Sequence, residues 1–310
     1  MEKKLLIAVD NSRHSENAVR YAAGFSGNRA GVKATLFHVL PALSQYLLDE
    51  ARKSPKARAE LNTLAARNNQ SAQELLQTYK ERMTSLGVAD ENVQQVARPR
   101  MLGVAKDILE YSLAGRFDAV VMGRRGLSGL QGLFMGSVSA NTVENAAATP
   151  VWLVDEPGPS RDVLVAVDGS ENSLKAVDHL AFMLQNAAEA RLSFLHVTPR
   201  LGDFCPVDFG ETGTEALEAV IRRGDRQCID RFFPRALKRL EDAGIPQSRI
   251  AVKVVEGAFR IGKCVMDEFQ KGKFGTLVVG RRGMGTKFFT GSVSRYIIDQ
   301  FSGGALWVVP

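Results

Sequence analysis

The chain has 310 residues, 45% of them hydrophobic and 24% charged, and carries a formal net charge of +6. This length and composition are typical of two globular domains of about 150 residues each. They exclude a membrane-spanning protein, because no apolar run approaches the roughly 18 residues that a membrane helix needs.

The distribution of charge and the first residues bear on the partners and the location of the protein. Basic residues are interleaved with acidic ones, and no basic tract studded with aromatic residues occurs, so we do not expect a nucleic acid partner. The first apolar stretch, residues 5–9, is short and is not followed by a cleavage site for a signal peptidase. We therefore expect a cytoplasmic protein that does not bind membranes.

In the first half of the chain, short apolar runs alternate with amphipathic helical segments. The pattern predicts strands at residues 4–10, 33–40, 92–97, 119–122 and 150–154. It predicts helices after Ser15 and over residues 43–86, 104–113 and 138–148, with a break near Pro55 because proline removes a helix hydrogen bond. Fully apolar strands between helices indicate an open α/β sheet with mainly parallel strands.

The pattern restarts after a linker at residues 155–162. Strands are predicted at residues 162–168, 191–198, 250–255, 276–279 and 305–309, and a helical region at 214–243 with a kink or break at Pro234. We therefore predict two domains, at residues 1–156 and 161–310.

A glycine-rich stretch at residues 118–139 is the most informative feature, and residues 274–294 repeat its plan. Both copies contain Gly-Arg-Arg-Gly after an apolar strand and end in Gly-Ser-Val-Ser. Glycines let backbone N–H groups turn toward a ligand, and a helix N-terminus adds further free N–H groups. A strand, a glycine-rich loop and a helix start together indicate an anion-binding cradle.

This stretch resembles the nucleotide signature of the universal stress protein family, Gly-x2-Gly-x9-Gly-Ser/Thr. Two residues separate Gly123 from Gly126, nine separate Gly126 from Gly136, and Ser137 follows. Val-Asp at the end of the first strand and His-Val before a proline after the second support the resemblance, which extends over nearly the whole doubled chain. The chain is therefore similar to a tandem universal stress protein.

The resemblance implies two repeated, open, mainly parallel five-stranded sheets flanked by helices, similar to the adenine-nucleotide alpha hydrolases. It also implies that the two domains dock as an intramolecular pseudo-dimer through their fifth strands. It implies ATP at the carboxyl edge of the first sheet, together with Mg²⁺ or Mn²⁺ on the phosphates. The matching positions of the first half are Val9, Asp10, Val39, Met122, Gly123, Arg124, Gly126, Gly136, Ser137, Val138 and Ser139.

The second half departs from the signature, because only seven residues separate Gly283 from Gly291. We expect the first half to hold the better ATP site, whereas the second binds fewer phosphates, another nucleotide or nothing. Its matching positions are Asp168, Val197, Gly280, Gly283, Gly291, Ser292, Val293 and Ser294.

Several residues keep two interpretations. Arg124 and Arg125 either screen phosphate charge or lie in a solvated loop or a dimer contact. Asp10 and its repeat either hold a phosphate-bound metal or cap the next turn. His38 and His196 are expected to be hydrogen-bonded parts of the scaffold.

The sequence favours an ATP-binding regulatory or stress-response protein that hydrolyses ATP slowly, if at all, with no catalytic residue assigned. An ATP-dependent enzyme of a related fold and a scaffold that no longer uses nucleotide are the alternatives. Homodimerisation stays open, and the sequence names neither the stress signal nor a protein partner.

Overall fold

The computed structural model describes residues 2–27, 31–126, 135–158, 160–185, 190–200, 214–258, 260–281 and 292–310. Within these residues the chain divides into two compact units. Unit 1 holds residues 2–126 and 136–155, and unit 2 holds residues 156–310. Each unit is an α/β fold built on its own five-stranded sheet.

The sheet of unit 1 is entirely parallel and has the order β3-β2-β1-β4-β5. Its central strand is buried on both faces, with Leu5, Leu6 and Ile7 fully enclosed, as expected of a parallel sheet covered by helices. The strands are β1 (Lys3–Ala8), β2 (Val32–Leu40), β3 (Val93–Pro99), β4 (Ala119–Gly123) and β5 (Val151–Val154).

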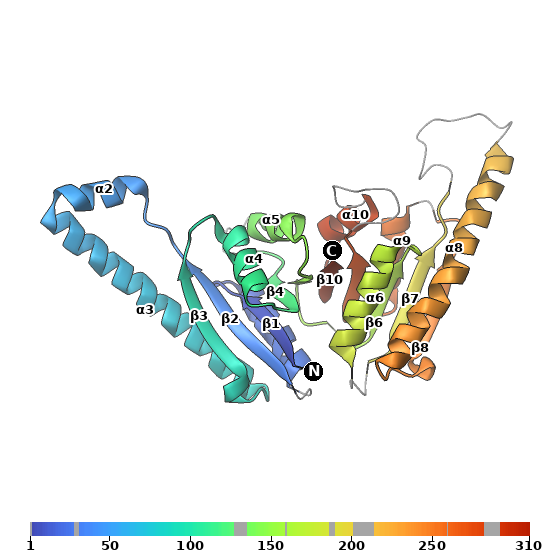
Figure 1. Ribbon diagram of the computed structural model, residues 1–310, viewed down its shortest axis with the longest axis horizontal. Coiled ribbons are helices and arrows are strands. Elements are labelled where there is room, and N and C mark those ends of the chain that lie inside the picture. Colours follow the sequence, from blue (N-terminus) through green and yellow to red (C-terminus); the bar gives the residue numbers. More distant parts are fainter. Residues whose placement is uncertain are drawn as a thin grey trace. The chain divides into compact units, whose positions relative to one another are not determined.

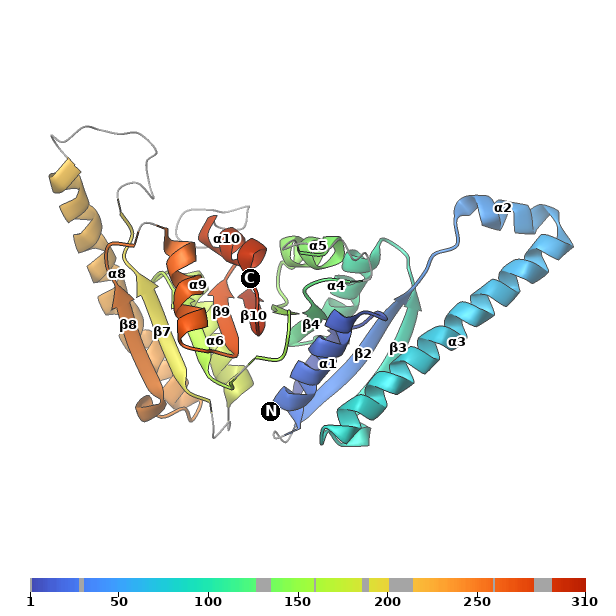
Figure 2. The same ribbon diagram turned by 180° about the vertical axis from the view of Figure 1, so that it is seen from behind.

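Helices cover both faces of this sheet. Figures 1 and 2 show α4 and α5 over one face and α1 and α3 over the other. The helices are α1 (Arg13–Ser26), α2 (Gln45–Lys53), α3 (Pro55–Ser85), α4 (Val104–Ala114) and α5 (Ser137–Asn145), with a 3₁₀ turn at Asp90–Asn92.

The predicted break near Pro55 is confirmed. Ser54 ends α2 and caps α3, because its side chain accepts a hydrogen bond from the N–H of Ala57. Pro55 then occupies the first turn of α3, where its missing N–H costs nothing.

Unit 2 repeats this architecture with the sheet order β10-β9-β6-β7-β8, again entirely parallel. Its strands are β6 (Val163–Val167), β7 (Leu192–Val197), β8 (Ile250–Val255), β9 (Thr276–Gly280) and β10 (Ala305–Val309). Its described helices are α6 (Glu171–Leu184), α8 (Thr214–Asp242), α9 (Ile261–Lys271) and α10 (Ser292–Gln300), with a 3₁₀ turn at Gln247–Arg249. Figure 1 shows α6 and α8 over one face of this sheet, and Figure 2 shows α9 and α10 over the other.

Of the kink or break expected at Pro234, the break does not occur, since α8 continues through this residue. Phe232 and Ala236, on either side of the proline, are buried against the rest of the unit. Their burial holds the helix together where the sequence alone predicted an interruption.

The repeated α/β architecture is thus confirmed, whereas the docking of the two domains as a pseudo-dimer stays a prediction. Among the described helices, none is both long enough and apolar enough to cross a membrane.

Candidate functional site

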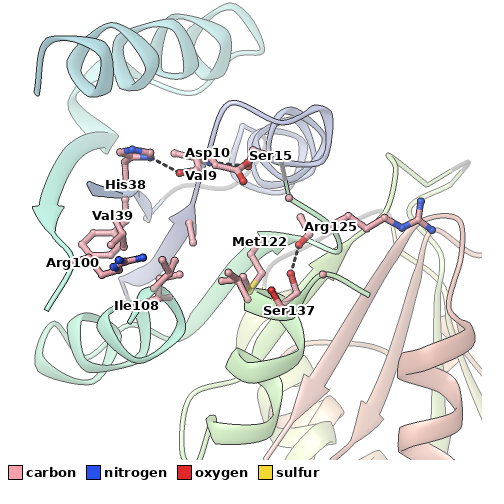
Figure 3. A pocket seen from close by; sticks show the side chains of 18 of the residues that line it. Val9, Asp10, Ser15, His38, Val39, Arg100, Ile108, Met122, Arg125 and Ser137 are labelled. Atoms are coloured by element: carbon pink, nitrogen blue, oxygen red, sulfur yellow. Dashed lines mark hydrogen bonds between the residues drawn. The ribbon is translucent and has the colours of Figure 1, made fainter. Parts of the chain in front are cut away.

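A cavity of about 460 Å³ lies at the carboxyl edge of the unit 1 sheet. Residues after β1, β2 and β4 form its floor, and the starts of α4 and α5 form its walls (Figure 3). Ligands of open α/β sheets bind outside the carboxyl ends of the strands, so the fold itself makes this the first place to look for a site.

The cavity brings together the residues that the sequence placed in the first site, with one exception. The candidates that line it are Val9, Asp10, Val39, Met122, Gly123, Gly126, Gly136, Ser137, Val138 and Ser139. Arg124 does not line the cavity, and its side chain is completely buried.

Two of the glycines make close contacts, and at Gly123 the neighbour is backbone. A Cβ atom on Gly123 would lie 2.7 Å from the backbone carbon of His14, so no side chain fits there. A Cβ atom on Gly126 would lie 2.9 Å from Oδ2 of Asp10. The end of β4 therefore packs closely against the first turn of α1 at His14, and Gly126 lies close to Asp10 in the turn that follows β1.

The start of α5 provides the anion-binding part of the site. Gly136 is the N-cap residue, no side chain caps the helix, and the N–H of Gly136 donates to the carbonyl of Arg124 over 3.0 Å. The N–H groups of Ser137, Val138 and Ser139 belong to the first turn, where a helix has no internal acceptors for them. The positive end of the helix dipole adds to their attraction for an anion.

The two serines of the cradle differ in what they can offer. The hydroxyl of Ser139 donates to the carbonyl of Gly123 over 2.8 Å, and this bond is buried. Its repeat in unit 2, Ser294, donates to the carbonyl of Gly280 over 2.6 Å. These hydroxyls therefore tie the helix to the preceding strand, whereas the Ser137 hydroxyl faces the cavity.

Arg125 is among the residues that line the cavity, but its guanidinium does not enter it. Figure 3 shows the side chain of Arg125 pointing away from the cavity, and its Nη2 lies 3.9 Å from Oδ1 of Asp155. Arg100, which sequence reasoning did not assign to the site, points into the cavity (Figure 3). The available signal was Arg98-Pro99-Arg100 itself, which stands where unit 2 has Val-Glu-Gly.

Other lining residues were also missed, because they come from segments far apart in the chain. They contribute mainly apolar surface, from β1, β2, α1 and α4. These residues are Ala8, Ser15, Phe37, His38, Leu40, Pro41, Val104 and Ile108.

Asp10 caps the turn that follows β1. Its Oδ1 accepts hydrogen bonds from the N–H of Ser12 over 3.2 Å and from the hydroxyl of Ser15 over 2.6 Å. Asp168 repeats both bonds with Ser170 and Ser173, at 3.0 and 2.6 Å. The capping interpretation therefore accounts for Oδ1, and a role for Oδ2 of Asp10 toward a phosphate-bound metal stays a prediction.

Tyr79 of α3 supports the same turn, because its hydroxyl donates to the backbone carbonyl of Asp10 over 2.9 Å. Burial, together with the neighbouring carboxylates of Asp10 and Glu16, raises the pKa of Tyr79 to about 12. The position of Asp10 is thus fixed from two sides.

The repeated histidines are hydrogen-bonded parts of the scaffold. Nδ1 of His38 lies 2.8 Å from the carbonyl of Val9, and Nδ1 of His196 lies 3.0 Å from the carbonyl of Val167. Nε2 of His196 also lies 2.9 Å from a carboxylate oxygen of Asp225, and both side chains are buried. The ring of His196 therefore links the end of β6 to α8, with a polar partner at each nitrogen.

The second-half candidates are only partly described. Asp168, Val197, Gly280, Ser292, Val293 and Ser294 belong to described segments at the carboxyl edge of the unit 2 sheet, and Gly283 and Gly291 lie outside the described residues. A cavity of about 330 Å³ in this unit is lined by Thr198, Pro199, Arg200, Glu218, Ile221, Arg222, Glu256 and Gly257. None of the predicted second-half positions is among these residues.

Unit 1 thus has the features of a ligand-binding α/β protein: a parallel sheet, a cavity at its carboxyl edge and an uncapped helix N-terminus facing that cavity. Comparison with known proteins identifies the family. The model of the universal stress protein family matches residues 1–155 and again residues 159–308. The chain therefore belongs to the universal stress protein family and contains two of its domains in tandem.

Individual relatives agree with this assignment. A Staphylococcus aureus (strain USA300) protein that carries the universal stress protein name is 31% identical over 148 residues, which cover 46% of this chain and 79% of the relative. The crystal structure of a universal stress protein from Archaeoglobus fulgidus superimposes with a TM-score of 0.66 at 18% identity, covering 99% of this chain and 97% of that one. At this identity the structural match supports the fold alone.

Proposed function

We propose that unit 1 binds ATP in the cavity at the carboxyl edge of its sheet and that the protein is a nucleotide-dependent regulator of a stress response. The observation that carries the proposal is the start of α5, where an uncapped helix N-terminus faces a cavity of about 460 Å³. This volume lies within the usual range of small-molecule sites.

The two ends of the cavity suit the two ends of a nucleotide. The phosphates would lie against the N–H groups of residues 137–139, beside Gly126 and the hydroxyl of Ser137. The base would lie at the other end, against the apolar side chains of Val39 and Ile108. Neutralisation of the phosphates would come from the helix and from a bound Mg²⁺ or Mn²⁺, since the side chain of Arg125 points away.

The lining residues favour binding over catalysis. The carboxylate of Asp10 is already engaged through Oδ1, and His38 is bonded to the backbone of Val9, so neither is arranged as a free general base. We therefore propose at most slow ATP hydrolysis. An ATP-dependent enzyme would turn over at about one per second or faster, which is near the low end for enzymes.

Unit 2 is proposed to bind nucleotide more weakly than unit 1 or not at all. Its loop between Gly283 and Gly291 is two residues shorter than the equivalent loop of unit 1, seven residues against nine. A shorter loop offers fewer backbone N–H groups to a triphosphate.

The test is analysis of the nucleotide released when the purified full-length chain is denatured, followed by titration of the nucleotide-free protein with labelled ATP, with and without Mg²⁺ or Mn²⁺. The proposal predicts ATP in the released fraction or saturable binding at micromolar concentrations, about −8 kcal/mol. Protein that is folded, carries no nucleotide and shows no saturable ATP binding would instead be the nucleotide-independent scaffold.

A further inference from the structure

The site contains a positive charge at the end where the base would lie. Arg100 follows directly on β3, and its N–H donates to the carbonyl of Leu40, the last residue of β2, over 3.2 Å. The sheet order places β3 three strands from β4, which corresponds to about 14 Å at the usual strand spacing. The backbone of Arg100 is therefore on the side of the cavity away from β4, and the loop that follows it returns toward the cradle, where residues 102–106 line a second hollow with Ser137 and Val138.

The backbone around Arg100 is held in place. Asp107, in the first turn of α4, accepts hydrogen bonds from the N–H groups of Met101, Leu102 and Gly103, at 3.0, 2.9 and 3.3 Å. These bonds fix the loop immediately after Arg100. The backbone of Arg100, from which its side chain extends, is thus held at the rim of the cavity.

The guanidinium of Arg100 is available to a ligand. Its side chain is exposed, and Figure 3 shows it directed into the cavity near Val39 and Ile108. Among the described residues no ion pair or side-chain hydrogen bond engages it. Arg98, two residues earlier, is different, because its guanidinium lies over the ring of Tyr111 at 5.9 Å from the ring centre.

The chemistry of arginine restricts which base it favours. A guanidinium has only N–H donors, so it pairs with acceptors and not with amino groups. Guanine and hypoxanthine carry an oxygen acceptor at position 6 beside the N7 acceptor, and arginine bonds to this pair in its commonest base contact. Adenine carries an amino donor at position 6, which leaves N7 and the ring face as its contacts with arginine.

We propose that Arg100 reads the base and that unit 1 accepts 6-oxopurine nucleoside triphosphates, represented by ITP and GTP, at least as well as ATP. This inference rests on the proposed nucleotide site and names a specificity residue within it. In unit 2 the position equivalent to Arg100 is Gly257, which has no side chain, so we expect this contact with the base only in unit 1.

The test compares ATP with ITP, two nucleotides that differ at position 6 of the base. Both are titrated into the nucleotide-free full-length wild type, the variant Arg100→Ala and the control variant Arg98→Ala. We expect the wild type to bind ITP at least as tightly as ATP, and Arg100→Ala to weaken ITP binding about tenfold, the size of one base contact by arginine, and ATP binding clearly less, because adenine offers only N7 and the ring face. Arg98→Ala should leave the ratio of the two affinities as in the wild type.

The outcomes separate this inference from the proposed function. If Arg100→Ala weakens ATP and ITP equally, the guanidinium contacts the phosphates or stacks on any base, and the inference is wrong while the site stands. If it changes neither affinity, Arg100 does not touch the ligand, and the inference is again wrong. If the folded wild type binds neither nucleotide, the proposed function itself fails.

Discussion

The hydroxyl of Ser139 donates to the carbonyl of Gly123, and this buried bond joins the first turn of α5 to the end of β4 over 2.8 Å. Ser294 and Gly280 repeat it in unit 2 at 2.6 Å. The bond holds the start of α5 against the carboxyl end of β4, and both segments line the cavity. Ser139, a residue of the nucleotide signature, thus uses its hydroxyl to stabilise the fold.

Replacing Ser139 with alanine should therefore lower stability. The carbonyl of Gly123 would lose its partner, at a cost of about 1 kcal/mol in the free energy of unfolding. Urea unfolding of the nucleotide-free protein measures this directly. The matched variant Ser137→Ala should instead keep the wild-type stability and weaken ATP binding, since this hydroxyl faces the cavity. Equal stability losses in the two variants would contradict the division of roles.

The buried pair of His196 and Asp225 should be a main source of stability in unit 2. Asp225→Ala would leave the buried Nε2 of His196 without its hydrogen-bond partner, which costs about 1 to 3 kcal/mol. Asp230→Ala, on the exposed side of the same helix, is the control and should have little effect. Thermal or urea unfolding distinguishes them, and an Asp225→Ala protein as stable as the control would show that the pair contributes nothing. ATP binding should be unchanged in both variants, because both lie in unit 2.

Because the pKa of Tyr79 is raised in the folded protein, we expect the free energy of unfolding to fall in alkaline solution. Its pKa is 10.0 in an unfolded chain and about 12 in the folded protein, since burial disfavours the phenolate. The unfolded state therefore loses its proton first, and the contribution of Tyr79 is complete below pH 10 and disappears as the pH rises from 10 to 12.

The variant Tyr79→Phe isolates this effect. It lacks the bond to the carbonyl of Asp10 and should be about 1 kcal/mol less stable at neutral pH. From pH 10 to about pH 12 its stability should then fall less than that of the wild type. Urea midpoints measured at both ends of this range provide the comparison, and parallel losses in the two proteins would rule out Tyr79 as the source.

Much of the fold could be predicted because its signals are local. Apolar runs such as residues 5–9 and 119–122 are strands buried on both faces, and Pro55 ends one helix and starts the next because it lacks an N–H group. Pro234 shows the limit of such reasoning. Its local effect is outweighed by the burial of Phe232 and Ala236, which depends on packing that the sequence pattern does not contain.

The candidate site likewise contains residues that the sequence could predict and residues that it could not. Spacing and resemblance placed the glycines and serines of the cradle, because these residues are close together in the chain. They could not give the direction of a side chain, so Arg124 was included although it is buried away from the cavity. Arg100 was missed for a related reason, since the sheet order alone brings the end of β3 to the far end of the same cavity.

Gly136 offers the sharpest test of where the nucleotide binds. A Cβ atom there would lie 3.3 Å from the Cα of Arg125, which is tight but not forbidden. Gly136→Asp would place a negative charge at the start of α5, where it would occupy the N–H groups and repel phosphates. Gly136→Asn has the same shape without the charge and is the matched control.

The decisive measurement is calorimetric titration of ATP into the nucleotide-free full-length wild type, Gly136→Asp and Gly136→Asn, which gives both affinity and stoichiometry. The account predicts one tight ATP per chain in the wild type, loss of most of this binding in Gly136→Asp and a clearly smaller loss in Gly136→Asn. Two equal sites per chain, or binding in Gly136→Asp that matches the wild type, would contradict the placement of the nucleotide in unit 1.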